Sequence, residues 1–359
     1  MIIGLAIPSL NSGGAERVIT TLANYWANKN KEVHLFVFSN SDSFYKLHPS
    51  IKIHCFEQIP SKNPIAKFTN ILKPVKSYKT TLMEVKPSVV ISFMTIVNIF
   101  SIKACTDLNI PVIISERNNV VDTPQKFHWN FLRKANYKKA SAIVLQTKRS
   151  LSCFSQLNIK LPTIQQVIFN PLSEECQQEV NLVGKEDLII SIGRFDDHKQ
   201  QDLLLKALST IDLKNWKVIL VGEGKNLETV KQLSRDLNLE NKVSFLGKRK
   251  DVASLLEKAS IFTLTSKSEG FPNALCEALA KGCACVSFDC EFGPGEIINK
   301  ENGILVEAQN IEKLAEAINK LIVSAEKRVE LSSNGMKIKE DLSVEKVIAK
   351  WENVIESVI

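Results

Sequence analysis

The chain has 359 residues, of which 44% are hydrophobic and 24% charged, which is ordinary usage for globular proteins and excludes a disordered chain. The length predicts two domains of roughly 150 residues each. The net charge is +7, but residues 1–170 hold 21 Lys and Arg against 8 Asp and Glu, whereas residues 171–359 hold 25 against 31. We therefore expect the first half to meet an anionic partner, with nucleic acid, phosphorylated lipid and an anionic membrane surface as candidates.

Short apolar strands alternate with helical patterns along both halves, which indicates βαβ units and parallel sheets. The first half predicts strands over 2–8, 33–38, 89–93, 112–115 and 142–145, with a helix over 14–29. The second half predicts strands over 188–192, 217–221, 242–245, 261–265 and 284–288. The expected fold class is α/β, with two Rossmann-like domains.

The domain boundaries follow from a change in composition. Residues 172–187 are rich in acidic and amide side chains without clear periodicity, so we predict a linker between a first domain over 1–171 and a second over 188–340. Residues 341–359 contain an amphipathic helix over 343–358, because apolar residues recur there at spacings of three and four. That helix could dock on the first domain or on its own.

Neither the cysteines nor the apolar runs predict a metal site or a membrane span. The eight cysteines form no C-x-x-C pair, and the five histidines supply no zinc-ligand spacing, so buried free thiols in a reducing cytoplasm are expected. The uncharged run over 87–102 is shorter than the ~20 apolar residues that cross a bilayer. Any membrane contact is expected to be peripheral.

Gly13 and Gly14 lie between the first predicted strand and the first helix. Small residues at a helix N-terminus allow a phosphate or another anion to approach the backbone N–H groups, although a tight strand–helix turn would also require them. The G-x-G-x-x-G fingerprint is absent here and at Gly222-Glu-Gly224, where Leu227 replaces the third glycine. A nicotinamide enzyme is therefore disfavoured.

Arg194 and Lys199 follow the predicted strand 188–192, at the sheet edge where open α/β folds bind ligands. Two cations there can neutralise a diphosphate, Arg through a forked contact and Lys as a point charge. A solvated surface pair is the alternative. Asp196, Asp197 and His198 lie between them, but adjacent carboxylates rarely face one ion, so we predict no metal.

Glu269 and Glu277 flank the start of a predicted helix at Pro272. Eight residues of helix rise ~12 Å, so the two carboxylates could hold separate hydroxyl-bearing parts of one extended ligand. The helix N-terminus between them would face its negative centre. A glycosidase pair would need carboxyls only ~5–9.5 Å apart. Glu277 could instead be a solvated helix residue.

Taken in order, these motifs resemble glycosyltransferase family 4. The resemblance covers nearly the whole chain and rests on Gly13-Gly-Ala-Glu16, Gly193-Arg194 with Lys199, Gly222-Glu-Gly224, Phe245-Leu-Gly247, Glu269 with Glu277, and Gly293-Pro-Gly-Glu296. It implies a GT-B fold, in which two Rossmann-like domains face a cleft and the C-terminal helix crosses back to the first domain. It also implies retaining, metal-independent transfer from a nucleotide sugar without a cofactor.

By position, the resemblance implies that Arg194 and Lys199 bind the donor diphosphate and stabilise the leaving group, with Glu269 at the donor sugar and Glu277 at the ribose. The catalytic residues would be Glu269, Arg194 and Lys199. The other donor-side positions are Gly14, Val252, Gly270, Phe271, Pro272 and Asn273. Arg117 stands where many relatives carry His, which leaves its role open. Gln200 replaces the Gly that usually follows the lysine.

The runs Leu10–Arg17 and Asp42–Lys46 are similar to bacterial GalNAc transferases that extend undecaprenyl-diphosphate-linked glycans. The basic first half supports a membrane surface independently, since each Lys or Arg near an anionic surface contributes ~1 kcal/mol. The candidate acceptor or membrane residues are Lys67, Lys73, Lys76, Lys79 and Arg117, with a second basic patch at Arg133, Lys134, Lys138 and Lys139. A solvated charged face is the alternative. Nucleic acid is not expected, because no nucleic-acid motif or aromatic stacking set accompanies these residues.

The expected function is retaining transfer of an N-acetylhexosamine such as GalNAc from a UDP donor. The acceptor would be an undecaprenyl-diphosphate-linked oligosaccharide at the cytoplasmic face of the inner membrane, in O-antigen, capsule or related surface-glycan assembly. Two alternatives remain open. A nucleotide-sugar epimerase on the same fold would need no acceptor, and a non-catalytic subunit would bind the nucleotide sugar without turnover.

Overall fold

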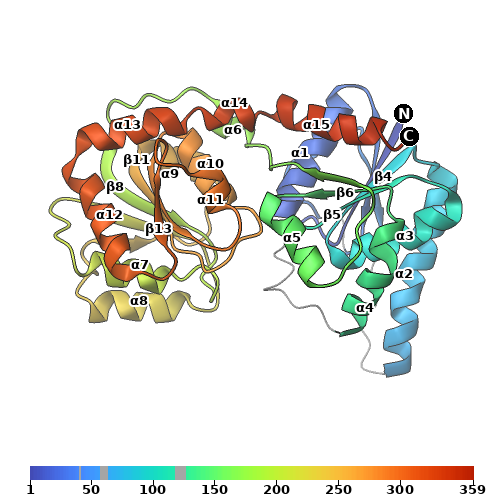
Figure 1. The fold of residues 1–359 in the computed structure, drawn as a ribbon, viewed down its shortest axis with the longest axis horizontal. Coiled ribbons are helices and arrows are strands. Elements are labelled where there is room, and N and C mark those ends of the chain that lie inside the picture. Colours follow the sequence, from blue (N-terminus) through green and yellow to red (C-terminus); the bar gives the residue numbers. More distant parts are fainter. Residues whose placement is uncertain (40–41, 57–63, 118–126) are drawn as a thin grey trace. The chain divides into compact units, whose positions relative to one another are not determined.

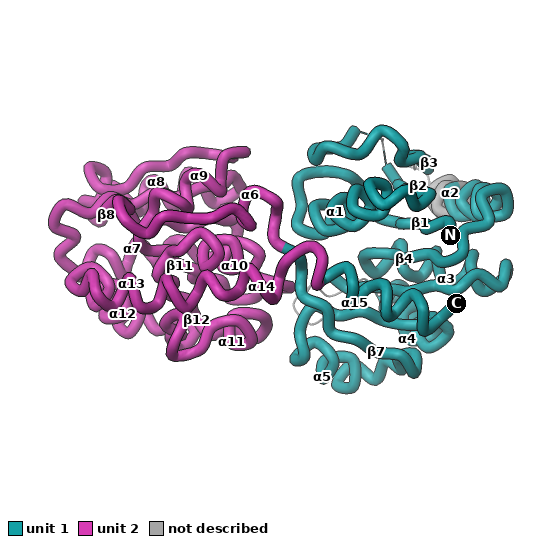
Figure 2. The backbone as a smooth tube through the Cα atoms, turned by 90° about the horizontal axis from the view of Figure 1, so that it is seen from above, with its two compact units in different colours: residues 1–171, 347–359 teal, residues 172–346 magenta. Residues whose placement is uncertain are grey.

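The computed structural model describes residues 1–39, 42–56, 64–117 and 127–359, and the side chains of residues 64–73 lie outside the description. It divides into two compact units (Figure 2). Residues 1–171 and 347–359 make unit 1, and residues 172–346 make unit 2. Each unit is a parallel β-sheet packed with helices (Figure 1), so the predicted α/β class with two Rossmann-like folds is confirmed.

In unit 1, seven strands among the described residues pair in the order β3-β2-β1-β4-β5-β6-β7, all parallel. The strands are β1 (Ile2–Ile7), β2 (Glu32–Val37), β3 (Lys52–Cys55), β4 (Val89–Phe93), β5 (Val112–Ser115), β6 (Ala142–Leu145) and β7 (Ile164–Val167). The helices are α1 (Gly14–Asn28), α2 (Pro64–Val85), α3 (Thr95–Leu108), α4 (Phe127–Asn136), a 3-10 turn (Tyr137–Lys139) and α5 (Lys148–Gln156).

In unit 2, six strands pair in the parallel order β10-β9-β8-β11-β12-β13. The strands are β8 (Glu186–Ile192), β9 (Lys217–Val221), β10 (Val243–Phe245), β11 (Ala259–Leu264), β12 (Ala284–Asp289) and β13 (Ile304–Glu307). The helices are α6 (Glu174–Gln177), α7 (Gln201–Leu208), α8 (Leu227–Asp236), α9 (Val252–Lys258), α10 (Asn273–Ala280), α11 (Pro294–Ile297), α12 (Ile311–Val323), α13 (Ala325–Gly335) and α14 (Ile338–Asp341).

The core of unit 2 lies on both faces of its sheet. Ile189 belongs to one apolar cluster, which α12 covers with Leu314 and Ile318, whereas Leu188 and Ile190 belong to a second cluster on the other face. Because successive side chains of a strand point to opposite faces, a strand buried on both sides is an unbroken apolar run. This is why the central strands could be predicted as short apolar segments.

The last helix, α15 (Val344–Glu356), matches the predicted amphipathic segment. Its apolar stripe is buried in unit 1, where the Trp351 ring lies 6.1 Å from the ring of Phe93 and the Trp26 indole donates to Glu352 at 3.2 Å. Trp351 is 1% exposed, so the helix closes the core of unit 1.

Most predicted strands recur within one or two residues, and four have the predicted bounds: β4, β5, β6 and β9. Three strands were not predicted, namely β3, β7 and β13. The predicted linker over 172–187 contains α6 and the first residues of β8. Seven of the eight cysteines are buried as predicted and Cys55 is exposed, and none of the eight, all of which the structure describes, forms a disulfide.

Candidate active site

The loop after β8 is held by the turn after β9. The N–H of Gly193 donates to Val221 O and that of Phe195 donates to Glu223 O, both at 2.9 Å. A Cβ on Gly222, whose φ is +142°, would lie 1.9 Å from Gly193 O. The glycine turn singled out in the sequence therefore lets two backbones touch, and its role is to shape the loop that carries Arg194.

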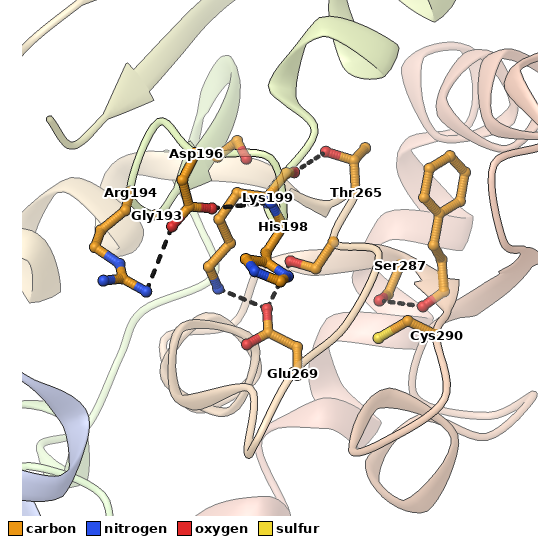
Figure 3. Close-up of polar contacts among 12 residues, drawn as sticks. Gly193, Arg194, Asp196, His198, Lys199, Thr265, Glu269, Ser287 and Cys290 are labelled. Carbon is orange, nitrogen blue, oxygen red and sulfur yellow. Dashed lines mark hydrogen bonds and ion pairs between the residues drawn. The ribbon is translucent and has the colours of Figure 1, made fainter. Parts of the chain in front are cut away.

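Lys199 and Glu269 form a partly buried ion pair beyond the carboxyl ends of the neighbouring strands β8 and β11 (Figure 3). Lys199 Nζ donates to Glu269 Oε1 at 2.6 Å, and Ser266 Oγ donates to the same oxygen at 2.6 Å. The Glu269 side chain is only 8% exposed. A Cβ on Gly193 would lie 3.1–3.3 Å from three carbons of the Lys199 side chain. The absence of a side chain at Gly193 therefore leaves room for the lysine side chain to reach Glu269.

Arg194 lies on the same loop but faces solvent. Its side chain is 81% exposed, and its Nη2 lies 3.4 Å from Asp196 Oδ2. Asp196 in turn accepts the backbone N–H groups of His198 at 3.0 Å and Lys199 at 3.2 Å, which fixes the turn between the two cations. The arrangement presents one forked, accessible guanidinium beside a held ammonium, which suits an anionic ligand such as a diphosphate.

The acidic residues of this loop serve the fold. Asp197 is exposed and accepts from Lys225 and from Asn226, away from the contacts of Asp196. Within the part of the chain that the structure describes, no group of three or more His, Cys, Asp and Glu side chains gathers in a way that could hold a metal ion.

The second predicted carboxylate, Glu277, lies in α10 and is 9% exposed, so its interpretation as a solvated helix residue is wrong. The helix begins directly after Pro272, and a Cβ on Gly293, whose φ is +95°, would lie 2.5 Å from the Pro272 ring. Phe271 is buried at 6% exposure. Gly293 thus allows the chain after β12 to pass against the start of α10.

The predicted donor-side residues divide between the units. Unit 2 holds Arg194, Lys199, Val252, Glu269, Gly270, Phe271, Pro272, Asn273 and Glu277, whereas Gly14 belongs to unit 1. Val252 opens α9 and packs against the second apolar cluster of unit 2. Of the predicted charged residues of unit 2, the structure brings Lys199 and Glu269 into contact and places Arg194 on the loop that carries Lys199.

Gly14 begins α1, and the carboxylate of Glu16 already occupies the space beside that helix N-terminus. A Cβ on Gly13 would lie 2.0 Å from Glu16 Oε2, and Ser9 Oγ donates to Glu16 Oε1 at 3.1 Å. The backbone N–H of Gly13 donates instead to Asn11 O at 3.0 Å, so the glutamate lies over the cap residue without capping it through a hydrogen bond. The Tyr45 hydroxyl donates to Gly13 O at 3.3 Å. This hydrogen bond connects the runs Leu10–Arg17 and Asp42–Lys46, which are the two segments that resemble the bacterial GalNAc transferases.

Arg117 is buried in unit 1, so the expectation that it belongs to a membrane-facing surface is wrong. Its guanidinium carbon lies 4.0 Å from the Phe93 ring and 5.6 Å from the Trp351 ring, and Nη1 donates to Asn170 at 2.6 Å. Its Nε and Nη2 have no hydrogen-bond partner among the described residues. Burial lowers the pKa of Arg117 to about 9. A contact with the acceptor stays a prediction.

The predicted basic residues differ in their surroundings. Lys76 is exposed, and Lys79 pairs with Asp107 at 2.5 Å. Lys67 and Lys73 lie in α2, but their side chains are outside the described residues. Arg133 is 2% exposed and faces Glu116 at 3.9 Å, so its assignment to the second surface patch is wrong. None of the described helices is long and apolar enough to cross a membrane.

The chain also matches known families along both units. The model described as "Glycosyl transferases group 1" matches residues 173–338, and that described as "Glycosyl transferase 4-like" matches residues 11–147. The chain is 30% identical, over all of its length and 99% of the relative, to a protein of Campylobacter jejuni. That relative is named "GalNAc-alpha-(1->4)-GalNAc-alpha-(1->3)-diNAcBac-PP-undecaprenol alpha-1,4-N-acetyl-D-galactosaminyltransferase". The chain belongs to the group 1 glycosyltransferases.

Two further similarities support the assignment. A second Campylobacter jejuni protein, named as an N-acetylgalactosamine-N,N'-diacetylbacillosaminyl-diphospho-undecaprenol 4-alpha-N-acetylgalactosaminyltransferase, is 30% identical over 89% of this chain and 90% of its own. The solved structure of Anabaena HepE in complex with UDP superposes with a TM-score of 0.85 at 19% identity, covering 99% of this chain and 100% of HepE. The predicted family, GT-B fold class and hexosyltransferase class are confirmed, and the group 1 match includes Arg194, Lys199 and Glu269.

Proposed function

We propose that this glycosyltransferase moves an N-acetylhexosamine, with GalNAc as the first candidate, from a UDP donor onto an undecaprenyl-diphosphate-linked oligosaccharide. The single observation that carries the proposal is the held Lys199–Glu269 pair beside the exposed Arg194, at the carboxyl edge of the unit 2 sheet. The names of the two Campylobacter jejuni relatives, which both specify GalNAc and undecaprenol-linked substrates, support the choice of substrates.

In the proposed reaction, Arg194 and Lys199 bind the donor diphosphate. Negative charge develops on the diphosphate as the glycosidic bond breaks, and preorganised cations stabilise that charge without reorganising. Glu269 binds the donor sugar in this proposal. Lys199 and Ser266 both donate to its Oε1, so we assign Oε2 as the atom that accepts a hydrogen bond from a sugar hydroxyl. Glu277 takes the ribose hydroxyls. The remaining donor positions are Gly14, Val252, Gly270, Phe271, Pro272 and Asn273.

We propose retention through attack on the same face that the leaving group departs from. The acceptor hydroxyl oxygen bonds to the anomeric carbon as the bond from that carbon to the diphosphate oxygen breaks, and the hydroxyl proton passes to the departing diphosphate. Glu269 is engaged by Lys199 and Ser266, so we assign it to positioning within an ion-pair mechanism and assign no covalent nucleophile. No metal or cofactor takes part in the proposed step.

We also propose that the enzyme works as a peripheral protein at the cytoplasmic face of the inner membrane, in the assembly of O-antigen, capsule or a related surface glycan. Exposed lysines of unit 1 support an anionic membrane surface as a partner, including Lys76 on α2 and Lys134, Lys138 and Lys139 around the end of α4. Nucleic acid is not among the proposed partners.

A transfer assay tests this proposal. The purified chain is incubated with UDP-GalNAc, UDP-GlcNAc or UDP-galactose and a lipid-linked oligosaccharide, and the product is read by mass spectrometry. Arg194→Ala, Lys199→Ala and Glu269→Ala are each expected to abolish transfer. Lys225→Ala is the matched control, because it removes only the exposed pair with Asp197 close to the same loop.

The alternatives have distinct outcomes in the same assay. Near-normal transfer by all three variants would contradict the site assignment. Formation of an epimer of the donor sugar in the absence of acceptor would establish the epimerase instead. Binding of UDP-sugars without turnover on any acceptor would favour the non-catalytic subunit.

A further inference from the structure

The outward face of α4 carries two aromatic rings in solvent. Phe127 is 87% exposed, the largest exposure among the large hydrophobic side chains of the described residues, and Phe131, one helical turn later, is 63% exposed. Lys134 continues the same face at a spacing of three, and the exposed Lys138 follows in the 3-10 turn after the helix. Two phenylalanines and two lysines thus follow one another along α4 and the turn behind it.

The inward face of α4 is anchored, so the two phenylalanines are held outward. Arg133 is buried against Glu116, and the Trp129 ring lies 5.9 Å from the Phe100 ring in an edge-on contact. Glu116 also accepts from the Thr95 hydroxyl at 2.9 Å and from the Tyr137 hydroxyl. These contacts fix the rotation of α4 about its axis, and they leave Phe127 and Phe131 with no place in the core of unit 1.

The charge around the rings selects one class of partner. Residues 127–139 contain Arg133, Lys134, Lys138 and Lys139 and no acidic residue. Exposed rings beside lysines match the boundary of a bilayer, where apolar groups enter the acyl layer and ammonium groups meet anionic headgroups. A second copy of the chain fits poorly, because a two-fold contact would bring the lysines of both copies together and a stable dimer buries ~800 Å² on each partner.

We propose that the face formed by Phe127, Phe131, Lys134 and Lys138 inserts its rings into an anionic lipid bilayer, with the lysines at the headgroup phosphates. This inference rests on the proposed function, since a lipid-linked acceptor lies in that bilayer. The exposed lysines of unit 1 already attract the protein to an anionic membrane in the proposed function. The present inference adds a specific site on α4 at which the protein enters the bilayer.

Vesicle binding tests the proposal without donor or acceptor. The full chain is sedimented with vesicles of phosphatidylethanolamine and phosphatidylglycerol, and separately with phosphatidylcholine alone. Phe127→Ser with Phe131→Ser is expected to lower the partition coefficient on both vesicles by on the order of 10- to 100-fold. Lys134→Gln with Lys138→Gln is expected to lower it on the order of 30-fold on the anionic vesicles only. Val323→Ser with Val329→Ser, which changes two exposed valines of unit 2, is the matched control and should bind as the wild type.

The fluorescence of Trp129 reports how deeply α4 enters the bilayer. The other tryptophans, Trp26, Trp216 and Trp351, are buried, whereas Trp129 is partly exposed on the same helix as the two phenylalanines, so brominated lipids should quench its emission when that helix meets the bilayer. Wild-type binding by the Phe127/Phe131 variant with no loss of quenching would overturn the proposal. So would a dimer in solution that this variant dissociates while vesicle binding stays unchanged. If the vesicle results are as expected but the chain transfers no sugar, the proposed function is contradicted and the proposed membrane-inserting face is still supported.

Discussion

Arg194 and Lys199 were predicted as two cations that bind one diphosphate, and the structure gives them different surroundings. Lys199 supplies the ion-pair partner of a carboxylate that is 8% exposed, whereas Arg194 is 81% exposed and lies beside Asp196. A buried carboxylate that loses its partner bears its full desolvation penalty, while an exposed pair contributes little to stability. The two residues are expected to share a role in transfer and to differ in their role in folding.

We expect Lys199→Ala to lower the free energy of unfolding by about 1–3 kcal/mol and Arg194→Ala to change it by less than about 0.5 kcal/mol, although both lose transfer. Urea unfolding of the purified variants measures the difference. A double variant, Lys199→Met with Glu269→Gln, removes both charges and should recover part of the lost stability. Equal stability of the two single variants would show that Glu269 does not depend on the lysine.

The buried Arg117 carries a second prediction at this scale. Two of its guanidinium nitrogens lack partners among the described residues, so Arg117→Met, which keeps the contacts with Phe93 and Trp351, should leave the free energy of unfolding equal or higher. If Arg117 contacts the acceptor as predicted, the same variant should lose 100-fold or more in kcat at unchanged stability. Transfer within about threefold of the wild type would contradict that contact.

Sequence reasoning at the residue scale found the types of charged groups at the site but not their burial. Nothing in the spacing of Ser115-Glu-Arg distinguishes a ligand contact from a core arginine, because the burial of Arg117 depends on Trp351, more than 200 positions later. The position of the Glu16 carboxylate against Gly13 was not predicted either, because the spacing of residues does not show which way a side chain in the first helical turn points.

At the scale of elements, the three strands missing from the prediction all lie at sheet edges. β3 and β7 close the two sides of the first sheet, and β13 closes one side of the second. An edge strand has one unpaired side, so it needs fewer apolar residues, and β7 with the sequence IQQV has none of the apolar run that identified the central strands. Periodicity therefore predicts the middle of a parallel sheet better than its rims.

Gly222 lies where two loop backbones touch, so we expect the methyl group of an alanine at this position to lower the free energy of unfolding strongly. Gly222→Ala would force the new carbon to within 1.9 Å of Gly193 O, so the loop that carries Arg194 must move. We expect a loss of about 3 kcal/mol or more in unfolding free energy, together with reduced transfer. Gly184→Ala is the control, because its φ of +90° imposes similar backbone strain with no atom within 4 Å, and it should cost about 1–2 kcal/mol. Equal losses of unfolding free energy in the two variants would mean that backbone strain, and not the clash with Gly193 O, causes the loss at Gly222.

At the scale of the whole molecule, the predicted donor-binding charges gather in unit 2 while the exposed rings and lysines of α4 belong to unit 1. The two-domain α/β fold could be predicted from the alternation of strands and helices, because each βαβ unit repeats the same pattern. The addition of residues 347–359 to unit 1 was implied by the family resemblance, but periodicity alone could not predict it, since the apolar stripe of α15 is compatible with either unit.

Thermal unfolding with UDP, GDP and NAD tests the donor assignment on the intact chain. A ligand at 100 times its Kd stabilises the folded state by ~2.7 kcal/mol, which corresponds to a rise in Tm of several degrees. We expect UDP to raise Tm, GDP and NAD to leave it unchanged, and Arg194→Ala to lose most of the UDP effect. A shift with GDP alone would move the donor to a GDP-sugar, and no shift with any nucleotide would contradict the catalytic assignment.

The position of α15 also bears on how the protein is made. Trp351 covers Phe93 and Arg117, yet the ribosome must add 175 residues after Pro171 before the part of unit 1 that begins at Val347 emerges. At synthesis rates of about 5–20 residues per second, the open core of unit 1 waits roughly 9–35 s for its final helix. During that interval its apolar surface is a target for chaperones, and a chain that is released early leaves the ribosome with its first unit unfinished.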